Sequence, residues 1–397
     1  MTQRRVSVGH INVGDTSGSS VTSAHINNDI RSRHQNVHDG QVSHNKKEDL
    51  KIVDQKTQLS KKKAKRAPRW RRNAGNNWLI PGTILAIVYT AYFLVARNNP
   101  DHWLNMFVKL SYNVPGTDMY GKGVKDYAFV AFHIIFFSFL REFCMQVALK
   151  PLAYHLGLRT SHKVNRFLEQ MYSLIYYGTT GPIGLYIMRY RCPELWYFNT
   201  TAFYEDFPHR VIDMWLKEFY LLQAAFWAQQ AIVLLLRLEK PRRDFYELVF
   251  HHIITMALIF LSYRFHFTKI GLDVYVTMDL SDFFLALSKI LNYLESPAVV
   301  FFYFLFVATW IYLRHYLNLV ILYSVATEFK TVGPYVLNWE TQQYKCWLSQ
   351  SITFSLLLLL QLVNLYWLWL VLRIAYRYLK DNVKEDVRSE VEDLSDD

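Results

Sequence analysis

The run ITFSLLLLLQLVNLYWLWLVLRIAY, at residues 352–376, is the feature that most constrains what this chain can fold into. A helix rises about 1.5 Å per residue, so roughly 20 consecutive apolar residues cross the hydrocarbon core of a bilayer. Apolar runs of this length recur from Trp78 to about Tyr376. The pattern therefore predicts an all-α polytopic membrane protein.

The apolar runs divide the chain into a polar tail, a membrane part and an acidic tail. We expect about eight membrane helices, at residues 78–96, 126–149, 171–189, 214–236, 246–264, 270–293, 298–325 and 347–376. Residues 1–77 are polar and lack a sustained apolar period, so we expect a disordered cytosolic tail there. The first helix and its loop, residues 78–125, precede the main membrane domain at 126–376, and residues 377–397 form the acidic cytosolic tail.

The net charge of +11 is concentrated in KKKAKRAPRWRR, residues 61–72, just before the first membrane helix. Such a block could bind nucleic acid, but beside a hydrophobic helix it marks the cytosolic side and lies against anionic lipid headgroups. Alternation of the helices then places both termini in the cytosol. The basic segment RLEKPRRDF, residues 237–245, also falls on the cytosolic side, as the positive-inside rule requires.

The same alternation places the loops at 97–125, 190–213 and 326–346 in the lumen. The sequon Asn199-Thr200-Thr201 lies in the second of these loops. Asn199 is therefore a candidate glycosylation site.

The chain has three cysteines, which are too few for a disulfide scaffold and lack the CxxC spacing of a structural zinc site. Cys192 and Cys346 lie in or beside lumenal loops and could form a disulfide. Two unpaired cysteines are the alternative, because the sequence does not give their separation. In the acidic tail, Ser389 and Ser395 are candidate phosphorylation sites.

Two adjacent histidines, His251 and His252, lie in the apolar run ELVFHHIITMALIF, and Asp279 and Asp282 lie in the following run VTMDLSDFFLALSK. One aspartate at a helix centre costs roughly 2.5–3.5 kcal/mol on insertion scales. These side chains must therefore face a bundle interior or a polar cavity. The two helices are joined by a short hairpin, so we expect antiparallel neighbours in which histidines and aspartates meet.

A carboxylate that holds an imidazole raises its basicity and fixes its tautomer. This pairing suits a general base that acts on an amine or a hydroxyl in a lipid-accessible chamber. Three other interpretations remain open: a structural polar network, a proton relay in a transporter, and a metal site made by HH and DxxD. We expect no metal, because the HxxxH and HxxHH boxes of membrane di-iron enzymes are missing from the sequence.

Residues 245–294, FYELVFHHIITMALIFLSYRFHFTKIGLDVYVTMDLSDFFLALSKILNYL, resemble the Lag motif of ceramide synthases, which are endoplasmic-reticulum enzymes of the TLC (TRAM, Lag, CLN8) superfamily. The resemblance extends outward through QAAFWAQQ, LEKPRRDF, WIYLRHYLN and TQQYKCW. It covers most of residues 78–380 and is strongest for the fungal branch. It implies that residues 126–376 form a TLC-type catalytic helical bundle around a lipid-accessible cavity.

The resemblance implies an enzyme that joins a fatty acyl group from acyl-CoA to the amine of a sphingoid base, giving a ceramide and CoA. His251, His252, Asp279 and Asp282 would form the catalytic site, with the aspartates orienting the imidazoles. Two routes remain open: direct attack of the amine on the thioester, or an acyl-imidazole on His251 with His252 as base, which we favour. The thioester is already activated, so we expect no cofactor; acyl-CoA is a co-substrate.

Basic residues at cytosolic helix ends are candidates for binding the CoA phosphates, with plain topology charge as the alternative: Arg159, Lys163, Arg166, Arg242 and Arg243. The resemblance also implies a very-long-chain acyl-CoA, an endoplasmic-reticulum membrane location, a small single-span regulatory subunit, and dimerisation with itself or a paralogue. The alternative function is a non-enzymatic TLC-fold protein that binds lipid or cargo, or associates with the translocon. In that protein the histidines and aspartates would form a structural network.

Overall fold

The computed structural model describes residues 78–99, 101–196, 198–238 and 244–381. The predicted tail at 1–77 and most of the acidic tail lie outside the described residues. From Ile80 onward, the described residues belong to one compact unit. Nearly all of them lie in helices or in the connections between helices.

The first half of the described chain contains, in order, α3 (Leu79–Ala91), the π-helix η1 (Tyr92–Ala96), α4 (Asn105–Val108), β1 (Met119–Tyr120), α5 (Lys125–Phe143), the π-helix η2 (Cys144–Leu149), α6 (Lys150–His155), α7 (Ser161–Tyr186), the π-helix η3 (Ile187–Arg191), and the short 3₁₀ helices η4 (Pro193–Leu195) and η5 (Thr201–Phe203). The second half contains β2 (Ile212–Asp213), α8 (Met214–Leu235), α9 (Phe245–Arg264), α10 (Thr268–Tyr293), α11 (Val299–Trp310), the π-helix η6 (Ile311–Leu317), α12 (Asn318–Thr331) and α13 (Trp347–Asp381).

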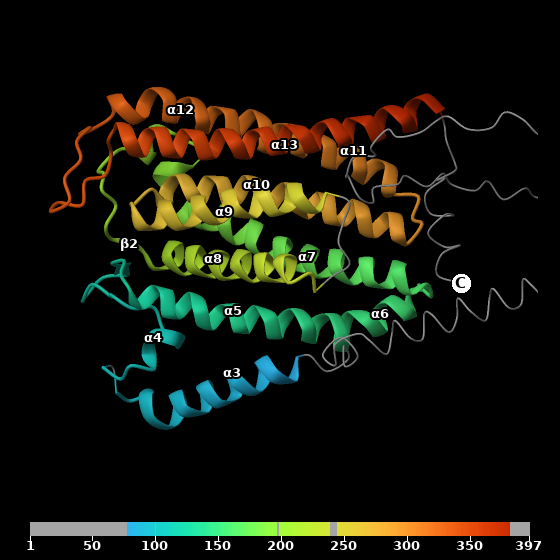
Figure 1. Cartoon of the computed structure of the whole chain (residues 1–397), viewed down its shortest axis with the longest axis horizontal. Helices are drawn as coiled ribbons and strands as arrows, with labels where there is room; N and C mark the ends of the chain where they lie inside the picture. The colour runs from blue at the N-terminus through green and yellow to red at the C-terminus, as the bar shows by residue number, and fades with distance from the viewer. Residues whose placement is uncertain (1–77, 100, 197, 239–243, 382–397) are drawn as a thin grey trace, which may run out of the picture. The chain divides into compact units, whose positions relative to one another are not determined.

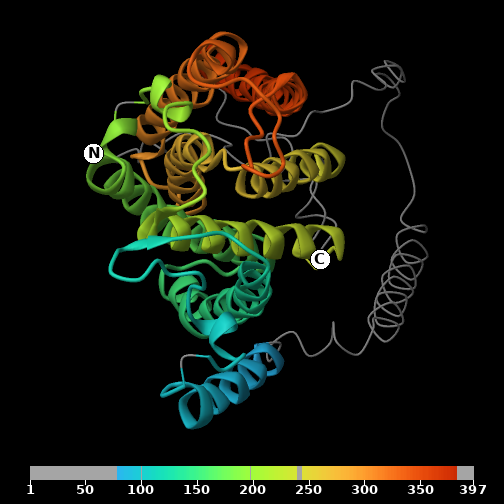
Figure 2. The same ribbon diagram turned by 90° about the vertical axis from the view of Figure 1, so that its left-hand side faces the viewer.

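The long helices α5 and α7 to α13 run side by side, as Figure 1 shows. The connections before α5, before α8 and before α13 lie at one end of the bundle, on the left in Figure 1, which we call the loop end. The turn between α6 and α7 and the C-terminal end of α13 lie at the opposite end. Figure 2 turns the loop end toward the viewer and shows α3 at the edge, beside α5, where Tyr89 packs 5.5 Å from Phe132 between ring centroids.

Each predicted membrane segment contains a long helix, and five helical segments are apolar enough to cross a membrane: Leu79–Ala96, Lys125–His155, Phe245–Arg264, Val299–Thr331 and Trp347–Tyr378. The described chain therefore has the composition of a multi-pass membrane protein. The helix predicted to begin at residue 171 begins at Ser161 instead. Its first turns are amphipathic, with Val164 and Phe167 buried among polar neighbours, and such turns lie outside a search for apolar runs.

The long helices that fall short of this apolarity in the described chain are α7, α8 and α10. On α10, Asp273 and Asp279 are fully buried, and Lys289 is 5% exposed. This helix packs against α7, α8, α9 and α11, so its polar side chains face protein rather than lipid. Low mean hydropathy here reflects an interior position.

Glycines on the face of α7 that meets α10 allow close packing of these two helices. A Cβ atom added to Gly181 would lie 2.9 Å from Leu280, and one added to Gly184 would lie 2.8 Å from Val276. Residues spaced by three share a helix face, so these glycines and Gly178 bring α10 close along several turns. They fix the position of the helix that carries both predicted aspartates.

At the loop end, a buried carboxylate joins the first part of the chain to the bundle. Asp126 at the start of α5 lies 2.7 Å from the Lys217 ammonium and accepts a hydrogen bond of 2.8 Å from the Tyr263 hydroxyl. Lys122, in the connection before α5, donates to the Thr268 hydroxyl at 3.2 Å. Burial and the nearby Lys217 charge lower the pKa of Lys122 to about 7, against the opposing pull of Asp126.

Candidate active site

Two cavities meet inside the bundle. The first, of about 180 Å³, lies among α8, α9, α10 and α13 and reaches the loop before α13 at Trp339 and Tyr344. The second, of about 230 Å³, lies among α7, α8, α9, α10 and α11 and reaches the opposite end at Arg237 and Asp244. The residues that line both cavities are Trp227, His251, Asp282 and Arg314. We call this group the junction.

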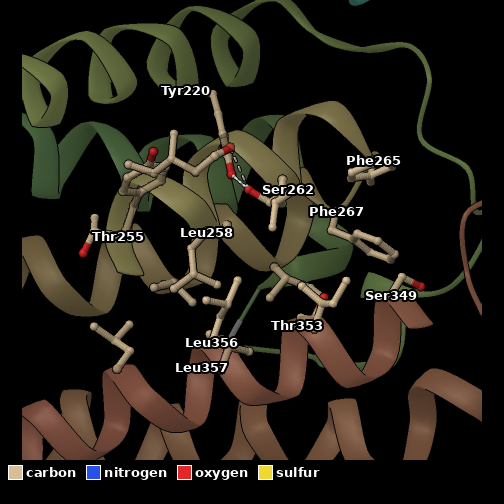
Figure 3. Close-up of a pocket in the computed structure, with 18 of the residues that line it drawn as sticks. Tyr220, Thr255, Leu258, Ser262, Phe265, Phe267, Ser349, Thr353, Leu356 and Leu357 are labelled. Atoms are coloured by element: carbon tan, nitrogen blue, oxygen red, sulfur yellow. Dashed lines mark hydrogen bonds between the residues drawn. The ribbon is translucent and has the colours of Figure 1, made fainter. Parts of the chain in front are cut away.

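The walls of the first cavity are mostly apolar. Figure 3 shows Leu258 and Ser262 on α9 facing Thr353 and Leu356 on α13 across it. The Tyr220 hydroxyl hydrogen-bonds the Ser262 hydroxyl, which in turn donates to a backbone carbonyl of its own helix. These polar atoms satisfy one another, so the wall remains suited to a hydrocarbon chain.

His251 is buried at the junction. Its ring lies between two indoles, with centroid distances of 5.1 Å to Trp367 and 6.0 Å to Trp227. Its Nε2 is 3.4 Å from the Thr255 hydroxyl, and its Nδ1 has no hydrogen-bond partner among the described residues. An imidazole with an unpartnered nitrogen at a cavity wall is available to a substrate.

His252 lines only the second cavity. Its Nδ1 is 2.8 Å from the Leu248 carbonyl oxygen, so Nδ1 carries the proton and donates to that carbonyl. The lone pair of the neutral ring is then on Nε2. The rings of His251 and His252 are 5.7 Å apart and nearly perpendicular, at 88°. A neutral imidazole in this tautomer can take up a proton at Nε2.

Asp282 and Asp279 lie in different surroundings. Asp282 lines both cavities and forms an ion pair of 2.6 Å with Arg314. Asp279 is fully buried, is not among the residues lining these two cavities, and accepts a hydrogen bond of 2.5 Å from Gln223. Gln223 in turn accepts one of 2.8 Å from Tyr176. Two helix positions that are three residues apart differ by about 300° of rotation, so the two carboxylates point in directions about 60° apart. They therefore meet different neighbours.

The described basic residues that were predicted to bind CoA phosphates do not line either of the two cavities. Arg159 is exposed, Lys163 pairs with Glu295 at 3.5 Å, and Arg166 pairs with Glu169 at 3.1 Å. Arg242 and Arg243 lie outside the described residues. Among the described residues, the cations that line the second cavity toward the end opposite the loop end are Arg237 and Lys289.

Asn199 is exposed in the connection between η4 and η5, where its amide donates to the Glu194 carbonyl at 3.1 Å. Cys192 and Cys346 are both buried and free, and Cys346 lines the first cavity. Burial, with help from the neighbouring Glu194, raises the pKa of Cys192 to about 12, so its thiol stays protonated. Among the described residues, no cluster of His, Cys, Asp and Glu could hold a metal ion.

Arg314 and Trp227 are junction residues that were not singled out from the sequence. Arg314 lies within WIYLRHYL, a charge inside an otherwise apolar run, and that signal could have identified it. Trp227 belongs to QAAFWAQQ, where an aromatic residue carries no comparable signal. The charged residue was recognisable from the sequence and the aromatic one was not.

Comparison with known proteins identifies the family of the chain. The model of the TLC domain (TRAM, LAG1 and CLN8) family matches residues 166–373, from α7 to α13. The chain belongs to the TLC domain family. It is similar to the ceramide synthase LAG1 of Saccharomyces cerevisiae (strain ATCC 204508 / S288c), with 55% identity over 318 residues that cover 80% of this chain and 77% of the relative.

Two further relatives extend the comparison within the TLC family. The chain is 47% identical to the sphingosine N-acyltransferase lac1 of Schizosaccharomyces pombe over 324 residues, which cover 81% of this chain and 83% of the relative. It is 30% identical to ceramide synthase 4 of Mus musculus over 238 residues, 58% of this chain and 56% of the relative. The predicted resemblance to ceramide synthases is confirmed.

Proposed function

We propose that this chain is a ceramide synthase that transfers a fatty acyl group from acyl-CoA to the amine of a sphingoid base and releases CoA. The observation that carries the proposal is the position of His251 where an apolar cavity meets a polar one. In an acyl-CoA thioester, the reacting carbonyl carbon joins an apolar acyl chain to the polar CoA group. An enzyme that uses it for N-acylation must therefore bind both parts on either side of this carbon. The names of the relatives, sphingosine N-acyltransferase and ceramide synthase, describe this reaction.

The acyl chain would occupy the first cavity. From His251 to Phe265, both in its wall, α9 extends by about 21 Å at 1.5 Å per residue, and the cavity continues to Leu337 and Trp339. A long, mostly apolar channel of this kind suits the very-long-chain acyl groups that the resemblance implies. The second cavity would hold the pantetheine arm, with Arg237 and Lys289 placed toward the CoA phosphates.

The two-step route is supported by the different positions of the two histidines. His251 is in contact with both cavities, so a nitrogen of its imidazole can attack a thioester carbon at the junction. CoA leaves through the second cavity, and the sphingoid amine then enters the space it vacates. His252, which lines that cavity alone, would take the amine proton before the amine attacks the acyl-imidazole.

We further propose that all eight long helical segments cross the membrane of the endoplasmic reticulum, with both termini in the cytosol and the loop end in the lumen. The interior position of α10, packed against α7, α8, α9 and α11, explains how a helix with charged side chains could do so. Asn199 lies in a loop-end connection, in agreement with a lumenal glycosylation site. Protease protection of a C-terminal tag in sealed microsomes tests this topology; a protected tag contradicts it.

The small single-span subunit and the dimer rest on the resemblance alone. Co-purification of the tagged chain with a second, differently tagged copy tests dimerisation. Mass spectrometry of the purified complex tests the subunit. Recovery of a single uncomplexed chain with full activity would contradict both.

The function is tested with the purified full chain, one sphingoid base and acyl-CoAs of graded length. We expect N-acyl product with the longest chains preferred. Intact-mass analysis after incubation with acyl-CoA alone distinguishes the routes, because only the two-step route leaves an acyl adduct that disappears when sphingoid base is added. An absence of N-acyl product at every chain length, with folded protein, would contradict the proposed function.

A further inference from the structure

Arg314 is a cation in the middle of the helical segment Val299–Thr331, which is apolar enough to cross a membrane. It lies in the π-helix η6 and is 3% exposed. Charged side chains inside membrane helices are rare and usually functional, and π-helical turns frequently occur at functional sites. Both features mark Arg314 as more than a topology charge.

The guanidinium is held from several sides. Nε donates to the Ser281 hydroxyl at 2.6 Å, and Nη2 donates to the Met278 carbonyl at 3.2 Å and contacts Asp282 at 2.6 Å. Nη1 donates to the side-chain oxygen of Asn364 at 3.3 Å. The ring of Trp310 lies 4.0 Å from the guanidinium carbon. A planar group held in this way keeps its orientation during a reaction.

One N–H of Nη1 is left for another acceptor. A guanidinium has five N–H groups; among the described residues, Ser281 accepts from Nε, Met278 accepts from Nη2 and Asn364 accepts from Nη1, while Asp282 forms an ion pair with Nη2. Because Arg314 lines both cavities together with His251, a substrate at the junction reaches this guanidinium. The remaining N–H of Nη1 has no acceptor among the described residues, and a bound substrate would then provide one.

Acyl transfer creates such an acceptor. When a nitrogen nucleophile adds to the thioester carbon, a C–N bond forms and the C=O π pair moves to oxygen as an oxyanion. When this intermediate collapses, the C=O bond re-forms, the C–S bond breaks, and CoA leaves as a thiolate that takes the proton lost by the nucleophile. The oxyanion forms in the direct route and in the two-step route alike. A fixed donor aimed at it stabilises the transition state.

We propose that Arg314 is a catalytic residue that donates an N–H to the carbonyl oxygen of the acyl thioester, and that Asp282 is a positioning residue that holds the guanidinium. The proposal rests on the proposed function, since it assumes an acyl-CoA at the junction. It assigns Asp282 a different task from orienting an imidazole. The competing explanation is that Arg314 only neutralises Asp282.

A double-variant comparison separates these explanations. In full-length protein, Arg314→Gln should lower kcat by about 100- to 1000-fold with little change in KM, because the donor acts on the transition state. Asp282→Asn together with Arg314→Gln removes both charges, so the buried site keeps no unpaired ion. We expect this double variant to stay as inactive as Arg314→Gln. Recovery of kcat to within about threefold of wild type would overturn the proposal.

Two further variants guard against misfolding. Arg314→Lys keeps the charge that faces Asp282 but loses the planar fork, so we expect a folded protein with kcat reduced at least about 10-fold. A wild-type kcat in this variant would also overturn the proposal. In Arg314→Ala, added guanidinium should restore part of kcat, which a merely structural role would not produce; no rescue in folded Arg314→Ala counts against the proposal.

Arg373→Gln is the matched control. Arg373 lies on α13, stacks on Trp369 at 5.6 Å and lines neither of the two cavities, so we expect near-wild-type kinetics. If wild type and this control make no N-acyl product, the proposed function fails. If both are active and Arg314→Gln is equally active, only the role of Arg314 fails.

Discussion

The two cavities share one junction and differ in their walls. Toward the loop end, the first cavity presents side chains such as Leu258, Phe267 and Leu356. Toward the opposite end, the second presents Arg237, Asp244 and Lys289. An apolar wall discriminates only weakly between acyl chains that differ by one methylene group. The length of the first cavity must therefore determine which acyl chain length is preferred. Charged walls fix a polar group in place, so the second cavity sets how the reacting carbon arrives.

The largest effect is expected at the junction itself. His251→Ala should lower the rate of N-acylation by about 100- to 10,000-fold, because it removes the imidazole that contacts both cavities. The measurement is product formation by purified protein at saturating substrates. His133→Ala is the matched control, since His133 is a partly buried histidine on α5 that lines neither cavity. Equal rates for the two variants would contradict the assignment.

The sequence was sufficient to predict a multi-pass, mostly helical protein and the neighbouring positions of α9 and α10, because both follow from local apolar runs and a short connection. It could not separate Asp279 from Asp282. Both sit in one apolar run, and only the packing of α10 against α8 and η6 shows that Gln223 donates to Asp279 while Asp282 faces Arg314. These partners lie on other helices, and no local pattern encodes such contacts.

The residues predicted to bind CoA show the same limit. The sequence places Arg159 and Lys163 near a helix end, which is where topology charges also occur. Whether a basic residue reaches a cavity depends on the direction of its side chain and on its partner. Lys163 pairs with Glu295, whereas Lys289, within α10, lines the second cavity.

The next effect sharpens the role of the second cavity. Lys289→Gln should raise KM for acyl-CoA about 10-fold while leaving KM for the sphingoid base nearly unchanged, because one charge-assisted contact to a phosphate is lost. Steady-state kinetics with each substrate varied in turn measures both constants. Lys163→Gln is the control, since Lys163 pairs with Glu295 away from the cavity. An equal rise in both KM values for Lys289→Gln would show general disruption instead.

A smaller effect is expected in the first cavity. Ser262→Leu adds volume beside Tyr220, so we expect the preferred acyl chain to become shorter, with activity toward the longest acyl-CoA falling by a few-fold, about 1 kcal/mol. Competition between acyl-CoAs of graded length measures the shift. Thr327→Leu, at a partly exposed position on α12 that lines neither cavity, should leave the profile unchanged. An unchanged profile in Ser262→Leu would mean that the acyl chain does not pass this level of the cavity.

The smallest effect lies outside both cavities, at Lys122. Its pKa is lowered to about 7, so between about pH 7 and its ordinary value the unfolded chain binds a proton that the folded chain does not. Stability therefore rises with pH across that window, and the cost of burying the charged form is fully present below it. The methionine of Lys122→Met cannot titrate, so this variant lacks the pH-dependent term. The difference in melting temperature, wild type minus variant, should therefore increase by about 2 °C between about pH 6 and about pH 9. The exposed neighbour Lys125→Met should show no such increase, and a constant difference for Lys122→Met would mean that the folded protein does not depress this ammonium.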